Sequence, residues 1–272
     1  MRTINFFAFL FISLTMLLSC NSSDDNSTPE EEQTDPNSIV IIPDANFKEA
    51  LIMYDNPVID TNNDGEIQVS EAEVIFELWV INKGIRNLQG VEAFKNIDKL
   101  YASSNGDLDT MDLTENKELE VLDVSFTELA SLNLTENFKL RELDCFSCSF
   151  LATLTYPTNG GVLEDINLSN TILTTINTSL LPELKYVACR NTKVTELDFS
   201  DNSLFIQLFA DNNPLLQEVN VKNGNNTAII DLQVFNSPNL TSICVDDIAY
   251  ANAQDLDRWK KDSNVIYTTN CN

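Results

Sequence analysis

Apolar residues recur beyond residue 74 in the pattern L-x-x-L-x-L-x-x-(N/T/C/S)-x-L, in which most positions marked x are polar. Eight copies follow one another at steps of 21 to 24 residues. They begin at Ile75, Ile97, Leu119, Leu140, Leu163, Leu184, Phe205 and Ile229. Each copy offers one short strand whose apolar positions 1, 4 and 6 cannot be buried alone, so the copies must share a core. The pattern therefore predicts a solenoid with one parallel β-sheet.

Position 9 of the pattern carries a small polar residue or a cysteine in every copy except the first, where it is Lys83. A small polar side chain at this position is expected to turn inward and to satisfy backbone groups of the neighbouring coil. The residues concerned are Asn105, Thr127, Cys148, Thr171, Thr192, Asn213 and Ser237.

The repeats resemble the leucine-rich repeat superfamily, and more narrowly the secreted bacterial proteins that join a calcium-loop N-terminal cap to short asparagine- and threonine-rich repeats. The resemblance covers roughly residues 39–272. It implies an α/β fold, a curved right-handed leucine-rich repeat solenoid with a parallel β-sheet on its concave face and capped ends. The expected parts are an N-terminal cap (39–74) with a short strand and a helix, eight repeats (75–245) and a C-terminal cap (246–272) with a helix and a strand.

The segment "DTNNDGEIQVSE", residues 60–71, matches the EF-hand-like calcium loop D-x-[DN]-x-[DN]-G-x5-E. Calcium requires six or more oxygen ligands, and this spacing brings them together within twelve residues. The predicted ligands are Asp60, Asn62, Asp64, Glu66 through its carbonyl, Gln68, and Glu71 with two oxygens. Because the loop is single, we expect a structural calcium ion that fixes the N-terminal cap, and no sensor function. The alternative is a solvated acidic turn.

Two cysteines frame the C-terminal cap, and we expect Cys244 and Cys271 to form a disulfide that contributes roughly 3 kcal/mol. Cys145, Cys148 and Cys189 fall at inward positions 6, 9 and 6, where buried thiols are expected. A metal site built on "CFSC" is the alternative, but no second cysteine pair and no histidine completes it.

Residues 1–19 have the features of a signal peptide, with Arg2 ahead of an apolar run that is too short to span a bilayer. The following "LLSC" resembles a bacterial lipobox, in which the signal is cleaved before Cys20 and that cysteine is lipidated. Residues 20–38 then form an acidic, disordered tether, because they contain no aliphatic or aromatic residue. We expect a lipid anchor in a Gram-negative outer membrane, with the protein exposed at the cell surface.

The chain has 16 Lys plus Arg against 42 Asp plus Glu, a net charge of −26, and no histidine. The negative charge disfavours binding to nucleic acid and to anionic membrane surfaces, so the lipid anchor is the only expected membrane contact. The lack of histidine excludes histidine-dependent triads, histidine-ligated zinc and imidazole bases.

Positions 3, 5 and 7 of the pattern alternate with the leucines, so their side chains are expected to point out of the sheet onto the concave face. Exposed aromatic side chains on such a face usually mark a contact surface. The alternative is that they pack on one another, and a register shift of one residue would turn them inward. The predicted contact residues are Trp79, Tyr101, Asp123, Asp144, Phe146, Tyr186, Arg190, Phe209 and Phe235.

These observations predict a non-enzymatic, monomeric surface protein that binds a protein ligand or mediates adhesion through its concave face. The alternative is a glycan-binding lipoprotein of a polysaccharide-uptake system, in which aromatic rings such as Trp79 and Tyr186 stack on sugars. An enzyme is the third possibility, because Glu142 and Asp144 form a pair of carboxylates. Both project from one flat sheet in which the sequence indicates no cleft, which disfavours catalysis.

Overall fold

The computed structural model describes residues 35–157 and 161–271. The predicted signal peptide and the lipidated Cys20 lie outside these residues. The chain divides into two units, residues 1–34 and residues 35–272, and every element described below belongs to the second. Within the described part, none of the helices has the length and apolar composition to cross a bilayer.

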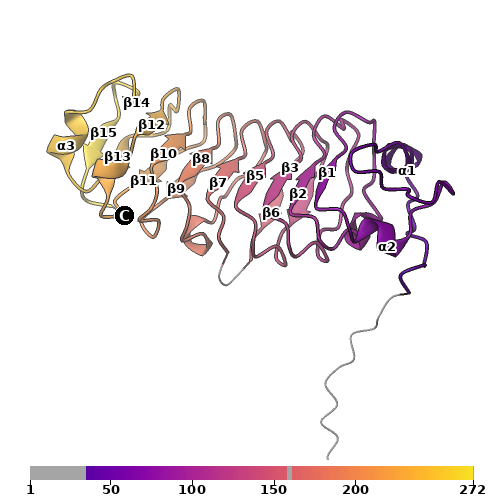
Figure 1. Cartoon of the computed structure of the whole chain (residues 1–272). Helices are drawn as coiled ribbons and strands as arrows, with labels where there is room; N and C mark the ends of the chain where they lie inside the picture. Colours follow the sequence, from indigo (N-terminus) through magenta and orange to yellow (C-terminus); the bar gives the residue numbers. More distant parts are fainter. Residues whose placement is uncertain (1–34, 158–160, 272) are drawn as a thin grey trace, which may run out of the picture. The chain divides into compact units, whose positions relative to one another are not determined.

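A nine-stranded parallel sheet runs along the stack of coils (Figure 1). Its strands pair in register, so that equal positions of the repeat lie side by side; Trp79, for example, lies beside Tyr101. This arrangement confirms the predicted parallel-strand solenoid and extends it from eight coils to about nine. The strands, in spatial order, are β1 (Glu77–Trp79), β2 (Lys99–Tyr101), β3 (Val121–Asp123), β5 (Glu142–Asp144), β7 (Asp165–Asn167), β8 (Tyr186–Ala188), β10 (Gln207–Phe209), β12 (Asp231–Val234) and β14 (Trp259–Lys261).

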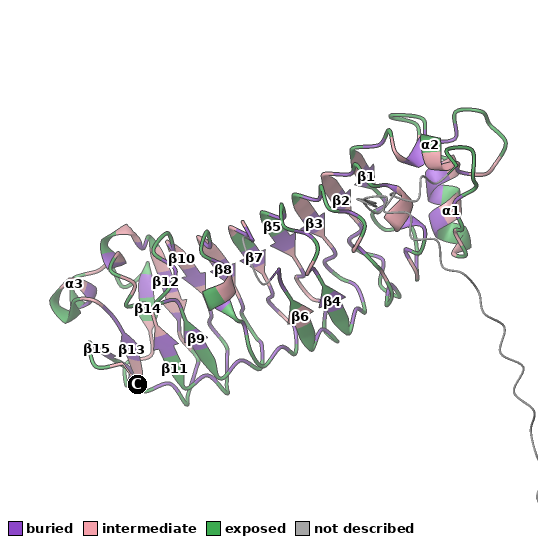
Figure 2. Cartoon of the chain, turned by 90° about the horizontal axis from the view of Figure 1, so that it is seen from below, coloured by how far each residue is buried: buried purple, intermediate pink, exposed green. Residues whose placement is uncertain are grey.

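A second set of short parallel strands, which the sequence pattern did not predict, follows the other side of the coils (Figure 1). In β4 and β6 the two outer residues of each strand are exposed, whereas the outward residues of the nine-stranded sheet are mostly half-buried (Figure 2). The set consists of a pair, β4 (Ser131–Asn133) with β6 (Thr153–Thr155), and a four-stranded sheet of β9 (Glu196–Asp198), β11 (Glu218–Asn220), β13 (Ser242–Cys244) and β15 (Ile266–Thr268).

Buried side chains at position 9 link most of the coils inside the core, as predicted, but Thr171 bonds only the Leu168 carbonyl of its own coil and the buried Ser237 hydroxyl has no hydrogen-bond partner among the described residues. Asn105 is fully buried and accepts hydrogen bonds from the backbone N–H groups of Lys83 and Ile85 in the preceding coil. Its Nδ2 donates to the carbonyls of Val80 and Ala102, both at 2.8 Å. The side chain thus satisfies four backbone groups that a purely apolar core would leave without partners.

Position 8 of the repeat adopts a left-handed backbone conformation in all eight copies, with φ between 51° and 63°. This turn ends the strand and sends the chain into the linking half of the coil. Asparagine tolerates the conformation best among residues with a side chain, which explains its frequency here. The residues are Asn82, Ser104, Phe126, Ser147, Asn170, Asn191, Asn212 and Asn236.

The N-terminal segment contains helix α1 (Ala45–Ile52), whose first turn is capped by Asp44 through a 2.9 Å bond from the Phe47 N–H. In place of the predicted short strand before it, Ile39 forms only an isolated bridge with Gln68. A second helix, α2 (Val69–Ala72), follows the predicted calcium loop.

Residues 35–38 differ from the predicted disordered tether. They form a turn in which the Pro36 and Ser38 carbonyls accept 3.0 Å bonds from the N–H groups of Ser70 and Val69. The first turn of α2 supplies these donors, because the first N–H groups of a helix have no partner within it.

The C-terminal segment differs from a simple cap. Besides helix α3 (Ile248–Asn252), it supplies β14 to the nine-stranded sheet and β15 to the second set, so it repeats the two-strand layout of the coils before it. Trp259 takes the inward place that an aliphatic residue holds in the other coils, and it is 2% exposed.

Candidate functional site

The outward face of the nine-stranded sheet, here called the sheet face, carries the side chains at positions 3 and 5 of each coil. The residue between them is buried in every strand. All nine predicted contact residues retain solvent access, and Trp79 and Arg190 are exposed. The position 7 row is more enclosed than predicted: Ser103, Ser125 and Asp211 are buried there, because the chain turns inward immediately afterwards.

An aromatic pair lies at the β1 end of the sheet face. The rings of Trp79 and Tyr101 stack with centroids 4.1 Å apart and an interplanar angle of 29°. Trp79 remains 47% exposed. Its indole Nε1 is 3.4 Å from a Glu77 carboxylate oxygen, and the other oxygen of Glu77 pairs with Lys99 at 2.5 Å. The ring is therefore held in place while it still presents apolar surface to solvent.

Four carboxylates, here called the acidic cluster, follow the aromatic pair across β3, β5 and β7: Asp123, Glu142, Asp144 and Asp165. The parallel register sets Asp123 directly beside Asp144, and Glu142 directly beside Asp165. Together with neighbours that include Tyr101, they line a shallow hollow of about 260 Å³. Like charges that face each other across neighbouring strands destabilise a sheet.

The acidic cluster has no cationic partner among the described residues. Burial raises the pKa of Asp144 above its ordinary value, with a further contribution from Asp123. Burial also raises the pKa of Asp165, and the charges of Glu142 and Asp144 add to the effect. The fold therefore holds these carboxylates where their ionisation is opposed.

The other end of the sheet face pairs its aromatic rings with cations of the same chain. The Arg190 guanidinium lies 4.3 Å from the centroid of the Phe209 ring and bonds Asp211 at 2.7 Å. Lys260 Nζ lies 4.1 Å from the centroid of Phe235. These ring faces are covered from within the molecule. Of the predicted aromatic contact residues Trp79 is exposed, whereas the others, including Tyr186, are half-buried.

The predicted calcium loop is tightly hydrogen-bonded to itself. Asp60 is buried and accepts bonds from the N–H groups of Asp64, at 3.2 Å, and Gly65, at 3.0 Å. Gly65 has φ +78°, a conformation that residues with a side chain rarely adopt. Asn62 Nδ2 lies 3.0 Å from both Asp64 Oδ2 and Gln68 Oε1, so these two oxygens converge on one atom.

Glu71 is placed differently from the predicted bidentate ligand. Its Oε1 accepts from the Thr61 N–H and hydroxyl, both at 2.8 Å, and from the Asn62 N–H at 3.4 Å. Its Oε2 accepts from the Gln68 N–H at 3.1 Å. Burial raises the pKa of Glu71, but these bonds outweigh burial and bring the pKa below its ordinary value. The carboxylate thus acts as a backbone clamp, and only Oε2 keeps a free lone pair.

The donor set of the loop fits a hard cation in its chemistry, whereas the position of Glu71 does not match a bidentate ligand. Glu66 pairs its side chain with Lys48 at 2.6 Å, which leaves its carbonyl as the group for a metal, as predicted. Among residues 35–157 and 161–271, no group of three or more His, Cys, Asp or Glu side chains is arranged to hold a metal ion. Calcium binding stays a prediction.

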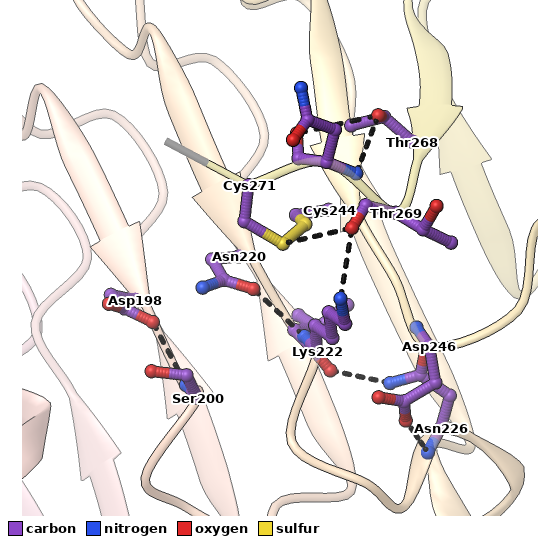
Figure 3. The surroundings of a disulfide bond; sticks show 12 residues. Asp198, Ser200, Asn220, Lys222, Asn226, Cys244, Asp246, Thr268, Thr269 and Cys271 are labelled. Carbon is purple, nitrogen blue, oxygen red and sulfur yellow. Dashed lines mark hydrogen bonds between the residues drawn. A yellow bond between two sulfur atoms is a disulfide. The ribbon is translucent and has the colours of Figure 1, made fainter.

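A disulfide joins Cys244 of β13 to Cys271, with Cα atoms 5.6 Å apart (Figure 3). Beside it, Lys222 donates from Nζ to the Thr269 carbonyl at 2.9 Å (Figure 3). Both contacts tie the last residues of the chain to the second set of strands.

The remaining described cysteines, Cys145, Cys148 and Cys189, are free and buried. Burial raises the pKa of Cys189 to about 12, so its reactive thiolate form is scarce. Cys148 lies with its Sγ 3.1 Å from the Val124 carbonyl, which gives the thiol a hydrogen-bond acceptor in the core. The three thiols lie in the apolar interior.

No family model matches the chain, and a search of curated proteins finds no match either. Among solved structures, the chain is similar to the leucine-rich repeat domain of the type III effector XopL, with a TM-score of 0.56 and 16% identity; the match covers 82% of this chain and 88% of that chain. It is also similar to YopM, a leucine-rich effector protein from Yersinia pestis, with a TM-score of 0.51 and 20% identity over 81% of this chain and 60% of that chain.

A third likeness, to internalin C2 from Listeria monocytogenes, has 21% identity over 76% of this chain and 95% of that chain, with a TM-score of 0.48. The first two likenesses and the sheet topology agree on the fold. The protein is a parallel-strand β-solenoid of about nine turns that shares the fold of bacterial leucine-rich repeat proteins.

Proposed function

We propose that the protein is a non-enzymatic, cell-surface leucine-rich repeat lipoprotein that binds another protein through the sheet face, which we take to be the concave face of a right-handed solenoid. The observation that carries the proposal is the aromatic pair Trp79–Tyr101, which is held in place and exposed beside four carboxylates without a cationic partner. Exposed, immobilised aromatic rings are typical of the residues that dominate protein interfaces.

The dimensions of the sheet face suit a protein partner. Nine strands at a spacing of about 4.8 Å give a surface roughly 40 Å long. Such a length is comparable to one side of a standard protein–protein interface, which buries about 800 Å² per partner. Stacked repeats create extended surfaces of this kind, which solenoid proteins use to bind partners.

Glycan binding is the alternative and has less support. Sugar stacking requires free aromatic faces, but Arg190 covers Phe209, and Tyr101 stacks on Trp79. Catalysis by Glu142 and Asp144 also has little support, because both project from one strand into a shallow, open hollow.

The proposal also includes a lipid anchor, two capping segments and a structural calcium ion. The signal peptide and a lipidated Cys20 anchor the protein in the outer membrane, and residues 20–34 act as its tether. The segments 39–74 and 246–272 cap the two ends of the core. A structural calcium ion in the 60–71 loop stiffens the N-terminal cap, and the protein acts as a monomer.

Capture of a binding partner tests the proposed function. The purified protein, immobilised, is exposed to proteins from the cell's surroundings, and bound partners are measured for the Trp79→Ala and Phe138→Ala variants. The two side chains are similarly exposed, at 47% and 43%, but Phe138 lies outside the sheet face. We expect Trp79→Ala to weaken binding at least tenfold, as for an interface hot spot, and Phe138→Ala to leave it unchanged. Equal effects would contradict the proposal.

A further inference from the structure

The four carboxylates of the acidic cluster form no ion pair with any Lys or Arg of the described residues. Every neighbouring Lys or Arg on the adjoining strands and loops is committed to another carboxylate: Lys99 to Glu77, Arg141 and Lys185 to Glu164. The register nevertheless sets Asp123 beside Asp144 and Glu142 beside Asp165, without an intervening cation in the described part of the chain. Among the described residues, no neighbouring Lys or Arg is therefore left to pair with these four charges.

The positions of the four carboxylates indicate which kind of cationic partner fits them. The four carboxylates lie on three neighbouring strands of a sheet, and no three acidic side chains among the described residues converge on a point that could hold a metal ion. Asp123 accepts a hydrogen bond from the backbone N–H of Ser125 at 3.0 Å. Asp144 accepts one from the backbone N–H of Phe146 at 2.7 Å. Charge distributed over about 10 Å fits an extended chain with several cationic side chains better than a single ion.

We infer that the partner of the sheet face is a basic polypeptide segment that crosses β1 to β7, places Lys or Arg side chains over the acidic cluster and packs one side chain against the exposed ring of Trp79. This inference rests on the proposed function and deepens it by stating the chemistry of the partner. The net charge of −26 attracts such a segment from a distance, and the stacked ring supplies cation–π or apolar contact at its end.

Burial raises the pKa values of Asp144 and Asp165, and the charges of neighbouring carboxylates add to the effect; a cationic partner favours the ionised forms of both residues, which agrees with this inference. The other end of the sheet face is less suited to the same segment. There Arg190 and Lys260 already occupy the aromatic faces and would repel further cations.

Binding of a fluorescent amidated octalysine peptide to the purified protein tests the inference, with octaglutamate as the negative probe. Glu142→Gln with Asp165→Asn removes two charges from the acidic cluster. The matched control, Glu115→Gln with Glu136→Gln, removes two exposed charges from the linking halves of coils. Both double variants are checked for an unchanged fold by thermal unfolding.

We expect octalysine binding to weaken about tenfold in the cluster variant and less than about twofold in the control, because contact charges count for more than net charge. Trp79→Ala is expected to weaken it severalfold. Equal losses of affinity in the two double variants would show that only the net charge of the protein matters, and would overturn the inference. Full displacement of the peptide by an equimolar amount of Ca²⁺ would overturn it as well. If octalysine does not bind but capture of a protein partner still depends on Trp79, this inference fails and the proposed function stands.

Discussion

The hydroxyl of Tyr54 accepts a 3.0 Å hydrogen bond from the backbone N–H of Trp79 and lies 3.4 Å from the carbonyl of Glu77. These two backbone groups belong to β1, the first strand of the nine-stranded sheet, which has no strand before it. The Tyr54 hydroxyl therefore contacts backbone groups at the edge of β1, where no neighbouring strand precedes it. It also fixes the backbone that presents the exposed indole of Trp79.

Removal of that hydroxyl should destabilise the fold. Tyr54→Phe leaves the Trp79 N–H without its partner, and we expect a loss of about 1–2 kcal/mol in the free energy of unfolding. Urea unfolding measures the change. Tyr186→Phe is the control, since the Tyr186 hydroxyl makes no hydrogen bond in the described structure; a similar loss in both variants would disprove the role of Tyr54.

Asn137 ties two coils together from within the core. It is 1% exposed, and its Nδ2 donates to the carbonyls of Leu113 and Asn116 at 3.0 and 2.9 Å. Asn137→Ala removes one of the two donors of each carbonyl, because the backbone N–H groups of Asn116 and Leu119 also bond them, so we expect a loss of about 1–2 kcal/mol in urea unfolding. Asn239→Ala, which removes a comparable bond at an exposed position, should cost less than about 0.5 kcal/mol. A small loss for Asn137→Ala would show that water or a rearranged backbone replaces the amide.

Asn191 holds a left-handed backbone conformation with φ 53° at the end of β8. Asn191→Ala should lower the free energy of unfolding by about 1 kcal/mol, because a Cβ without a compensating polar group is disfavoured there. Asn191→Gly should be nearly neutral, since glycine adopts this conformation freely. If both variants lose the same stability, the cause is the lost side-chain bond to Asn170 at 3.0 Å and not the backbone.

The raised pKa of Asp144 gives a pH-dependent prediction. A carboxyl whose pKa is higher in the folded than in the unfolded state is penalised when ionised, so its unfavourable contribution is present at neutral pH and disappears as the pH falls through the folded pKa. Asp144→Asn should therefore stabilise the protein at pH 7, because it removes a charge that burial opposes and that faces the like charge of Asp123; such a cross-strand pair costs about 0.2–1 kcal/mol.

Thermal unfolding of Asp144→Asn and the unchanged protein, measured from pH 7 downward, checks this prediction. The difference between them should shrink as the pH falls below the folded pKa of Asp144. Glu115→Gln, at an exposed position outside the sheet face, should show no such dependence. Destabilisation by Asp144→Asn at pH 7 would contradict the prediction, because it would mean that the bond from the Phe146 N–H to the carboxylate outweighs the cost of its burial and of the neighbouring charge. A carboxylate that costs stability and serves binding is a common compromise at functional sites.

Removal of calcium tests the loop of residues 60–71. If the ion fixes the N-terminal cap, EDTA should lower the melting temperature of the purified protein without a large change in shape, and excess Ca²⁺ should restore it. In Asp64→Asn the response to EDTA should be weaker, because one anionic ligand is lost. An unchanged melting curve would contradict the calcium prediction and would leave Glu71 as a clamp of the loop only.

The parallel sheet followed from the sequence because its pattern spans a whole strand and recurs in eight copies. Buried residues such as Leu78 and Leu100 alternate with polar ones, and a shift by one residue would expose the entire row. The second set of strands left too weak a pattern. In β4 and β9 only one inward residue, Leu132 or Leu197, stands between two exposed ones. Such short segments do not reveal a period.

Two other features depended on residues outside the pattern. The sequence pattern did not predict the ninth coil, because Trp259 and Lys261 stand at the repeat positions of Leu232 and Val234. A Lys at a position that is apolar in the other copies breaks the pattern. In the folded chain its ammonium group donates to the Val265 carbonyl.

At the sheet face, the sequence correctly identified the rows at positions 3 and 5 as outward, whereas the position 7 row is more enclosed than predicted. It could not show which aromatic rings are free, because the cover over Phe209 comes from Arg190 in the neighbouring coil. The role of Tyr54 was equally hidden, since it depends on how the N-terminal segment packs against β1.

Hydrogen–deuterium exchange of the protein with and without its captured partner tests the central claim most directly. The account predicts slower exchange in the strands of the sheet face from β1 to β7, with the largest change near Trp79 and Asp144, and no change in the second set of strands. Protection confined to β9, β11, β13 and β15, with β1 to β7 unaffected, would contradict the account.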